Sequence, residues 1–212
     1  METTKKTRTR LSPEARIAEI LDHAAAIVSS EGVAAVSMER VGKEAGISKS
    51  LVYSYFPSNT ELLKALLQRE LQELRRKQTR ASLRAETFEQ MVRGITREYL
   101  AHIEQRGLLI YRLQSEPSVS GGGAITDYGR DASVQYLAEI VHRVFDIPMS
   151  IAVPATDISF GLPDAAGNYL DEKKADRQTV EDITVAMIIG SVKALKDNYE
   201  VSFKPIRDKD TP

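Results

Sequence analysis

The sequence predicts an all-α protein. Apolar residues recur with the 3.6-residue period of a helix in most long segments, and no segment shows the sustained alternation of a strand. Helix-start signals precede several of these segments. The clearest is Ser12-Pro13-Glu14, which opens a stripe of apolar residues from Ile17 to Val28 that ends near Gly32. These observations together predict helices packed on helices.

The charge distribution separates two parts of the chain. The 212 residues carry 29 Lys and Arg against 30 Asp and Glu, and the net charge of −1 by itself predicts no nucleic-acid partner. Residues 1–80 hold 14 basic against 10 acidic side chains, whereas the remainder holds 15 against 20. A basic N-terminal part on an acidic remainder suits a DNA-binding domain joined to a non-binding one. Ordinary surface variation explains so small an excess equally well.

Composition also excludes several classes of function. The absence of cysteine excludes disulfides, thiolate zinc sites and cysteine nucleophiles, and it fits a reducing cytoplasm. The longest apolar run, residues 185–192, is too short to span a membrane, and the basic N-terminus does not resemble a secretory signal. The three histidines lie in separate segments, and no catalytic or nucleotide-binding motif is present. We expect no catalytic residue, no metal and no cofactor.

Residues 37–61 predict a helix-turn-helix. Ser37 can cap a short helix, Gly46 can end it, and Ser48 can cap a second short helix that stops before Pro57. A capping box, Ser58 to Glu61, then opens a longer helix. Such a second helix lies in the DNA major groove, and its apolar residues would face a core: Leu51, Val52 and Phe56.

The same stretch resembles the tetracycline-repressor (TetR) family of bacterial transcriptional regulators. The family pattern appears in order as Glu44-Ala45-Gly46-Ile47-Ser48, then Leu51 through Ser58, then Glu61-Leu62-Leu63. One departure is Asn59, which stands where the family usually carries a Lys that reaches a DNA phosphate. An Asn amide can still donate a hydrogen bond to phosphate.

The resemblance and the helix-turn-helix geometry together select the residues expected to touch DNA. Lys49, Ser50, Tyr53 and Ser54 would face the bases or the adjoining backbone, with Tyr55 as a second tyrosine. The remaining candidates are expected at phosphates, and for the two serines simple helix capping is the alternative: Ser37, Lys43, Ser48 and Asn59. A basic arm, residues 1–11, could follow the DNA backbone or be a plain solvated tail.

The rest of the chain predicts a helical C-terminal domain, residues 58–212, behind a DNA-binding domain of residues 1–57. A connecting helix occupies 58–79, and further helices are expected over 88–106, 108–113, 125–145 and 177–199. Residues 115–123, with three consecutive glycines, predict a loop. Residues 148–172 predict a long connection typical of a lid or binding loop, unless a short helix lies around residues 152–160.

The resemblance implies a homodimer that reads palindromic double-stranded DNA and a small-molecule effector bound in the C-terminal domain. Apolar positions on two helices are the candidates for the dimer interface: Leu137, Val141, Val144, Met187, Ile188 and Val192. Polar or aromatic residues within apolar helices are the candidates for the ligand pocket, although core packing or surface exposure is the simpler explanation for each: Tyr99, His102, Ile103, Tyr111, Arg112, Gln114, Tyr128 and Tyr136.

The function expected from these features is that of a repressor released from its operator by a ligand. An activator, or a DNA-binding module that responds to no ligand, would fit the same residues. A small helical enzyme is the rival of another class, and the scattered histidines and missing motifs disfavour it.

Overall fold

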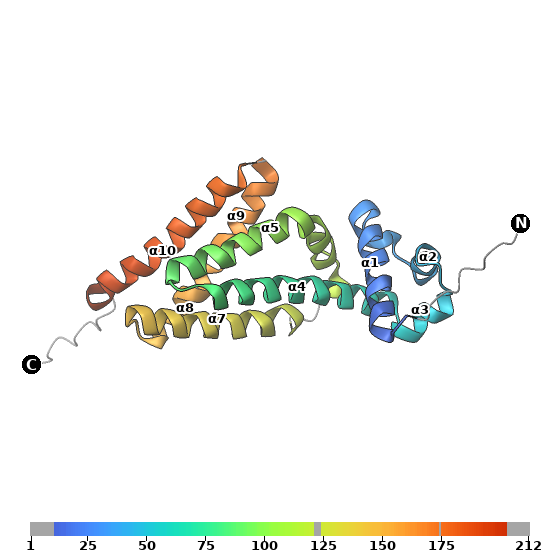
Figure 1. Cartoon of the computed structure of the whole chain (residues 1–212), viewed down its shortest axis with the longest axis horizontal. Coiled ribbons are helices and arrows are strands. Elements are labelled where there is room, and N and C mark those ends of the chain that lie inside the picture. Colours follow the sequence, from blue (N-terminus) through green and yellow to red (C-terminus); the bar gives the residue numbers. More distant parts are fainter. Residues whose placement is uncertain (1–10, 121–123, 174, 203–212) are drawn as a thin grey trace, which may run out of the picture. The chain divides into compact units, whose positions relative to one another are not determined.

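The computed structural model describes residues 11–120, 124–173 and 175–202. Over these residues, α-helices and one 3-10 helix are the only regular elements, so the all-α prediction is confirmed (Figure 1). The chain divides into two compact units, and α4 and α5 each contribute residues to both. The described part of the first unit is residues 11–70 with 108–120; that of the second is residues 71–107, 124–173 and 175–202. The domain boundary at residue 57 stays a prediction.

The first unit begins with three helices whose starts are fixed by serine side chains. The hydroxyl oxygens of Ser12, Ser37 and Ser48 accept hydrogen bonds from backbone N–H groups three residues onward, at 3.1–3.2 Å. These bonds satisfy donors that a helix N-terminus leaves without a partner. The elements are α1 (Pro13–Glu31), η1 (Val33–Ala35), α2 (Met38–Glu44), α3 (Lys49–Tyr55) and the start of α4 (Asn59–Arg84).

Charged contacts join α1 to its neighbours in the first unit. Arg40 of α2 donates two hydrogen bonds to the Glu31 carboxylate at 2.6 and 2.7 Å, and Arg69 of α4 reaches Asp22 at 2.7 Å. Arg112, near the end of α5 (Phe88–Gln114), donates to the carbonyl oxygens of Val28 and Ser29 at 2.6 and 2.7 Å. Those carbonyls lie in the last turn of α1, where few backbone donors remain, and the Val28 oxygen also accepts from the Gly32 N–H at 3.0 Å. The end of α5 is therefore bonded to α1.

Three expected boundaries are wrong. The helix predicted to end near Gly107 continues as α5 to Gln114. Glycine inside a helix costs about 1 kcal/mol relative to alanine, and the helix retains it because Leu109 and Leu113 beyond it are fully buried. Residues 117–120 form the short helix α6 (Pro117–Ser120) within the predicted loop, whose three glycines lie outside the described residues. The connecting helix α4 extends past residue 79 to Arg84.

The long connection predicted over residues 148–172 is also wrong. Two helices fill it, α8 (Met149–Ser159) and α9 (Gly161–Lys173), so the alternative of a short helix around 152–160 is confirmed. Prolines misled the prediction. Pro148 precedes α8 and Pro163 lies in the first turn of α9, where proline needs no helical partner, while Pro154 alone lies inside a helix.

The second unit is completed by α7 (Ala124–Phe145) and α10 (Arg177–Ser202). Val141, Ile147, Ala152 and Val192 share one buried cluster, and Phe88 packs edge-on against Phe145 with ring centroids 4.9 Å apart. This cluster draws on α7, α8 and α10, and a second cluster of the same unit joins Leu100 of α5, Leu170 of α9 and Val180 of α10.

A buried carboxylate joins α10 to α5. Glu181 is 2% exposed, and Arg97 donates to its two oxygens at 2.9 and 3.1 Å. Arg93 lies 3.6 Å from the same carboxylate and pairs with Asp182. A buried charge is tolerated when charged donors satisfy it, so removal of one arginine should be strongly destabilising.

Candidate nucleic-acid interface

The turn between α2 and α3 brings the two helices unusually close. Gly46 has a φ of 62°, a left-handed conformation that glycine adopts without strain, as predicted for the residue that ends α2. Gly42, inside α2, is buried, and a Cβ there would lie 3.0 Å from the Ile47 carbonyl oxygen and 3.4 Å from a Val52 methyl carbon. The close packing of α3 against α2 therefore depends on Gly42, which has no Cβ.

One face of α3 is anchored in the core, and the other is free. Val52 and Phe56 are buried, as predicted, whereas Leu51, expected in the core, is 36% exposed. Helical period alone placed Leu51 on the inner face, but the seven-residue helix touches the core mainly through Val52. The exposed face carries Lys49, Ser50 and Tyr53, the last 47% exposed.

The polar side chains of α3 already make local contacts. The Lys49 ammonium lies 3.7 Å from a Glu39 carboxylate oxygen, and both side chains are more than half exposed. The Ser48 and Ser50 hydroxyls are 3.0 Å apart, and Ser54 donates to the Leu51 carbonyl oxygen at 2.7 Å. An exposed ion pair contributes at most about 1 kcal/mol, so Lys49 can exchange Glu39 for another anion.

The other predicted DNA contacts differ in accessibility. Ser37 and Ser48 are exposed and cap their helices, Lys43 is exposed, and Tyr55 is partly buried. Asn59 is also partly buried, and its amide nitrogen donates to the Val36 carbonyl oxygen at 2.5 Å. A phosphate contact from that nitrogen would compete with this bond. The four basic residues of the N-terminal arm lie outside the described residues, which begin at Leu11.

The ligand-pocket candidates fall into both units. Tyr111, Arg112 and Gln114 belong to the first unit, where Tyr111 is 70% exposed, Gln114 is exposed and Arg112 is bonded to α1. The side chain of Tyr128 lies outside the described residues. The second unit holds the other candidates: Tyr99, His102, Ile103 and Tyr136. The candidates are therefore divided between the two units.

Within the second unit, Tyr99 is the candidate with the most distinctive surroundings. Its hydroxyl donates to Asp164 of α9 at 3.0 Å, and burial together with the Asp164 charge raises the pKa of the phenol. A Cβ at Gly167 would lie 3.3 Å from a methyl carbon of Ile103 and 3.3 Å from a ring carbon of Tyr99, so both side chains pack closely against this glycine. His102 is 2% exposed. The Tyr136 hydroxyl of α7 lies 3.5 Å from the Ser82 hydroxyl of α4, and the two helices run side by side in Figure 1.

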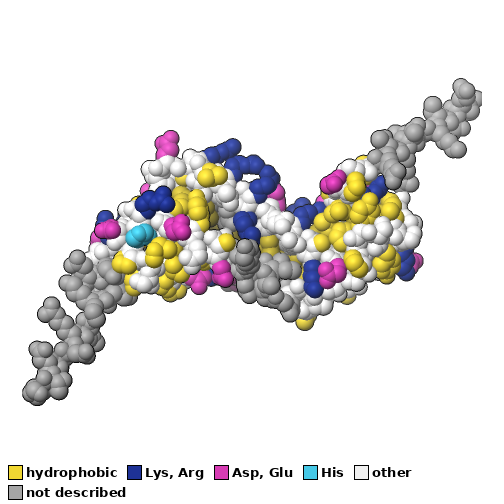
Figure 2. Space-filling view, turned by 90° about the horizontal axis from the view of Figure 1, so that it is seen from below, with side chains coloured by type: hydrophobic (Ala, Val, Ile, Leu, Met, Phe, Trp, Pro, Cys, Tyr) yellow, Lys and Arg dark blue, Asp and Glu magenta, His cyan; other side chains and the backbone are white. Residues whose placement is uncertain are grey.

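The dimer-interface candidates divide between core and surface. Val141 and Val192 are each 5% exposed in the same cluster of one protomer, and Leu137 and Ile188 are partly buried. Val144 and Met187 are more than half exposed, as is Ile183, one turn before Met187. Hydrophobic side chains reach the surface in several places between charged ones (Figure 2). Any contact with a second copy would rest on the exposed members of this set.

Sequence reasoning missed two features of the interface region. The Glu39–Lys49 pair joins residues ten apart on different helices, and no helical spacing rule predicts it. The close approach at Gly42 had no local signal, because a glycine in the middle of a predicted helix is ordinarily read only as a weak point. Among the described residues, no group of His, Cys, Asp and Glu could hold a metal ion, and no helix is both long and apolar enough to cross a membrane.

In the first unit, α2, the turn at Gly46 and the exposed, polar α3 form a helix-turn-helix. This arrangement defines a class of DNA-binding proteins. Residues 20–66 match the sequence model of the bacterial regulatory proteins of the tetR family. This match covers the capped helices and the glycine turn, and it confirms the resemblance to the family in residues 44–63.

Relatives and solved structures agree with this assignment. The chain is 29% identical over 138 residues to the HTH-type transcriptional repressor KstR of Mycolicibacterium smegmatis; the match spans 65% of each chain. A tetR-family regulator from Streptomyces coelicolor has a TM-score of 0.70 at 20% identity, covering 89% of this chain and 85% of its own. The fatty acid degradation regulator FadR of Bacillus halodurans has a TM-score of 0.62 at 15% identity, covering 88% and 96%. The two structures show a shared fold.

Proposed function

We propose that this protein is a transcriptional repressor that binds a palindromic operator as a homodimer and leaves it when a small molecule binds. The observation that carries the proposal is the exposure of Lys49, Ser50 and Tyr53 on α3, a helix that the buried Val52 anchors. Lys can donate to guanine and Ser to either base type, and a tyrosine hydroxyl can bond a phosphate. The similarity to KstR, a repressor by name, supports the sign of regulation.

Contacts to the DNA backbone would fix the position of α3 in the groove. Ser37 and Ser48 are exposed at the first residues of α2 and α3, and Lys43 is exposed on α2. Because the Asn59 amide is bonded to Val36, we assign most of the anchoring to Tyr53, Tyr55 and the basic N-terminal arm. Phosphate contacts of this kind position a protein on DNA without reading sequence.

The proposed dimer would use the exposed apolar residues of α7 and α10. Ile183 and Met187 are one turn apart on α10, and each is more than half exposed. Apolar surface of this kind is stabilised when a second copy covers it. A two-fold dimer would present its two α3 helices to half-sites about 34–36 Å apart.

Release by a ligand would be a population shift. A ligand that binds more tightly to the conformation with poor DNA affinity weakens operator binding by that difference in affinity. The region of Tyr99, His102 and Ile103 in α5 is our proposed location, because a partly buried tyrosine, a buried histidine and the closely packed Gly167 occur there together. We further propose a cytoplasmic location, as expected for a protein that binds chromosomal DNA.

A mobility-shift assay with the DNA upstream of the protein's own gene tests the proposal. Wild-type protein should retard a fragment containing the palindrome, and Tyr53→Phe should weaken that binding while circular dichroism stays unchanged. Failure of the wild type to bind this or any genomic fragment would contradict DNA binding. A reporter gene behind the bound fragment distinguishes repressor from activator. Candidate effectors added to the assay then distinguish a ligand-responsive regulator from a constitutive one.

A further inference from the structure

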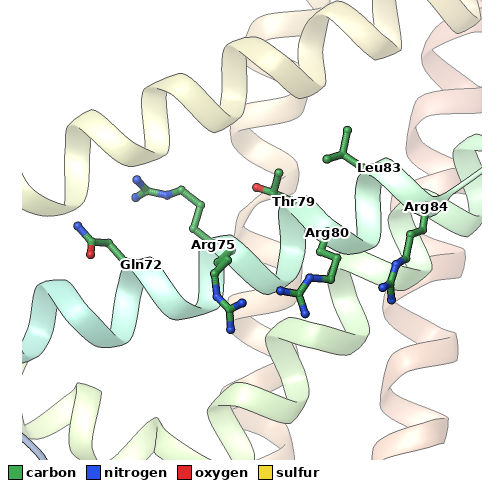
Figure 3. Close-up of a pocket in the computed structure, with 7 residues that line it drawn as sticks. Gln72, Arg75, Thr79, Arg80, Leu83 and Arg84 are labelled. Atoms are coloured by element: carbon green, nitrogen blue, oxygen red, sulfur yellow. The ribbon is translucent and has the colours of Figure 1, made fainter. Parts of the chain in front are cut away.

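Four arginines project from the exposed surface of α4 in the second unit, and three of them, Arg76, Arg80 and Arg84, succeed one another along one face of the helix. A surface hollow of about 590 Å³ is lined entirely by residues of this helix, none of them acidic: Gln72, Arg75, Arg76, Thr79, Arg80, Leu83 and Arg84. Figure 3 shows Arg80 and Arg84 pointing to the same side of the helix, while Leu83 points in another direction. We call this face the arginine face. From sequence alone it is explained by helix capping and solvation.

Three of the four arginines lack an acidic neighbour. Arg76 pairs with Glu73 at 2.8 Å, but no carboxylate of the described residues lies within 4 Å of Arg75, Arg80 or Arg84. Arg76, Arg80 and Arg84 succeed one another at four-residue intervals, which places them about 6 Å apart along the helix. Like charges at this spacing destabilise a helix. A bound anion would remove the repulsion.

The chemistry of the hollow fits a small anionic molecule. The hollow is open to solvent and not an enclosing pocket, so charge would hold a ligand there. Guanidinium groups bind phosphate and carboxylate through paired N–H donors, and several of them together select ligands with more than one anionic group. Leu83 is 74% exposed beside the arginines and offers an apolar contact to the remainder of a ligand.

We infer that the arginine face of α4 is a binding site for a small organic polyanion that carries two or more phosphate or carboxylate groups. The inference does not depend on DNA binding or on an effector role. It uses residues other than those proposed for the pocket around Tyr99.

Calorimetric titration of the full chain with three probes tests the inference: inorganic tripolyphosphate, citrate and inorganic phosphate. Tripolyphosphate or citrate should bind, the better of the two identifying the preferred anionic group, and inorganic phosphate should bind at least tenfold more weakly. The double variant Arg80→Gln/Arg84→Gln should weaken the polyanion about tenfold or more, because each lost bond to a charged group is substantial. The matched control is Arg143→Gln, at an exposed arginine of α7 that does not line the hollow.

Several results would overturn the inference. These are the absence of tripolyphosphate and citrate binding by the wild type, or equal weakening by Arg143→Gln. Leu83→Glu provides a second variant, since a carboxylate beside Arg80 and Arg84 should also repel the polyanion, and unchanged affinity there would count against the site. DNA titrations of the same variants separate the alternatives. If the double variant loses operator affinity and salt dependence while no polyanion binds to the wild type, the arginine face contacts the DNA backbone instead.

Discussion

The Asn59 amide nitrogen donates a hydrogen bond to the Val36 carbonyl oxygen at 2.5 Å. Val36 directly precedes the N-cap of α2, and Asn59 is the first residue of α4, so the bond joins the start of one helix to the start of another 23 residues later. Val36 is buried, so its carbonyl has little access to water. Asn59 is thus a structural residue of the first unit at a position where the family usually has Lys.

Asn59→Ala should destabilise the protein by about 1 kcal/mol, because it removes one hydrogen bond and leaves a carbonyl oxygen without its donor. Urea unfolding followed by circular dichroism measures the change. Asn198→Ala is the control, since the Asn198 amide also donates to a backbone carbonyl but on the exposed surface of α10. Equal losses in the two variants would show that burial of the Val36 bond has no special role.

Gly42→Ala should destabilise the first unit by about 1–2 kcal/mol, since overpacking typically outweighs the gain in helix propensity. The added Cβ would lie 3.0 Å from the Ile47 carbonyl oxygen, and this backbone atom cannot move without shifting the turn into α3. Operator affinity should fall with stability. Gly161→Ala is the control because a Cβ there meets nothing within 4 Å. Unchanged thermal unfolding of Gly42→Ala would mean that α2 and α3 separate readily.

Lys49→Ala should weaken operator binding without unfolding the first unit, because Lys49 is exposed and its contact with Glu39 is weak. If Lys49 binds a phosphate, the slope of log affinity against log salt concentration should fall by about one. Binding isotherms at four or more salt concentrations measure this slope. Lys193→Ala, an exposed lysine on α10, should leave it unchanged. Full affinity and an unaltered slope in Lys49→Ala would remove the residue from the interface.

Tyr99 should make the stability of the second unit sensitive to high pH. Burial and the neighbouring Asp164 charge raise the pKa of the phenol above its ordinary value of 10.0. The unfolded chain therefore releases this proton at lower pH than the folded one, so the free energy of unfolding should fall as the pH rises above about 10. Tyr99→Phe should show a shallower fall in urea unfolding between pH 8 and 11. Tyr169→Phe, at a 54% exposed position, serves as the control.

Met187→Glu should convert the proposed dimer to a monomer. Met187 is 53% exposed within one protomer, so the substitution should be tolerated by the folded chain, whereas two buried carboxylates facing one another across an interface would be costly. Sedimentation velocity measures the mass. Glu139→Gln on the exposed surface of α7 provides a conservative comparison. A wild-type protein that sediments as a monomer at micromolar concentration would contradict the dimer itself.

Local signals predicted the first unit well. The serine caps of α1, α2 and α3 and the left-handed Gly46 depend on a few neighbouring residues, and such signals can be read directly from the sequence. Exposure of the α3 residues followed from the same pattern, apart from Leu51. The contacts of Lys49 and Asn59 could not be predicted, because they join residues on different helices.

Tertiary packing decided the second unit. Pro154 and Gly107 are ordinarily helix breakers, yet both lie within helices whose neighbouring residues are buried, Ala152 beside the first and Leu109 beside the second. Glu181 reads as one charge among many in the sequence, although the fold buries it against two arginines. The ligand-pocket candidates were chosen by residue type alone, and that criterion could not reveal that α5 contributes to two units.

The bond from Arg112 to the end of α1 has a consequence for how such a protein can be divided. Leu109, Ile110 and Leu113 are buried in the same unit, although about forty residues separate them from the end of its N-terminal portion. A fragment that stops after residue 70 would lose this packing and leave the last carbonyls of α1 without their guanidinium. The DNA-reading part is therefore not a transplantable module. A chimera that grafts it onto another regulator would need to carry over the end of α5 as well.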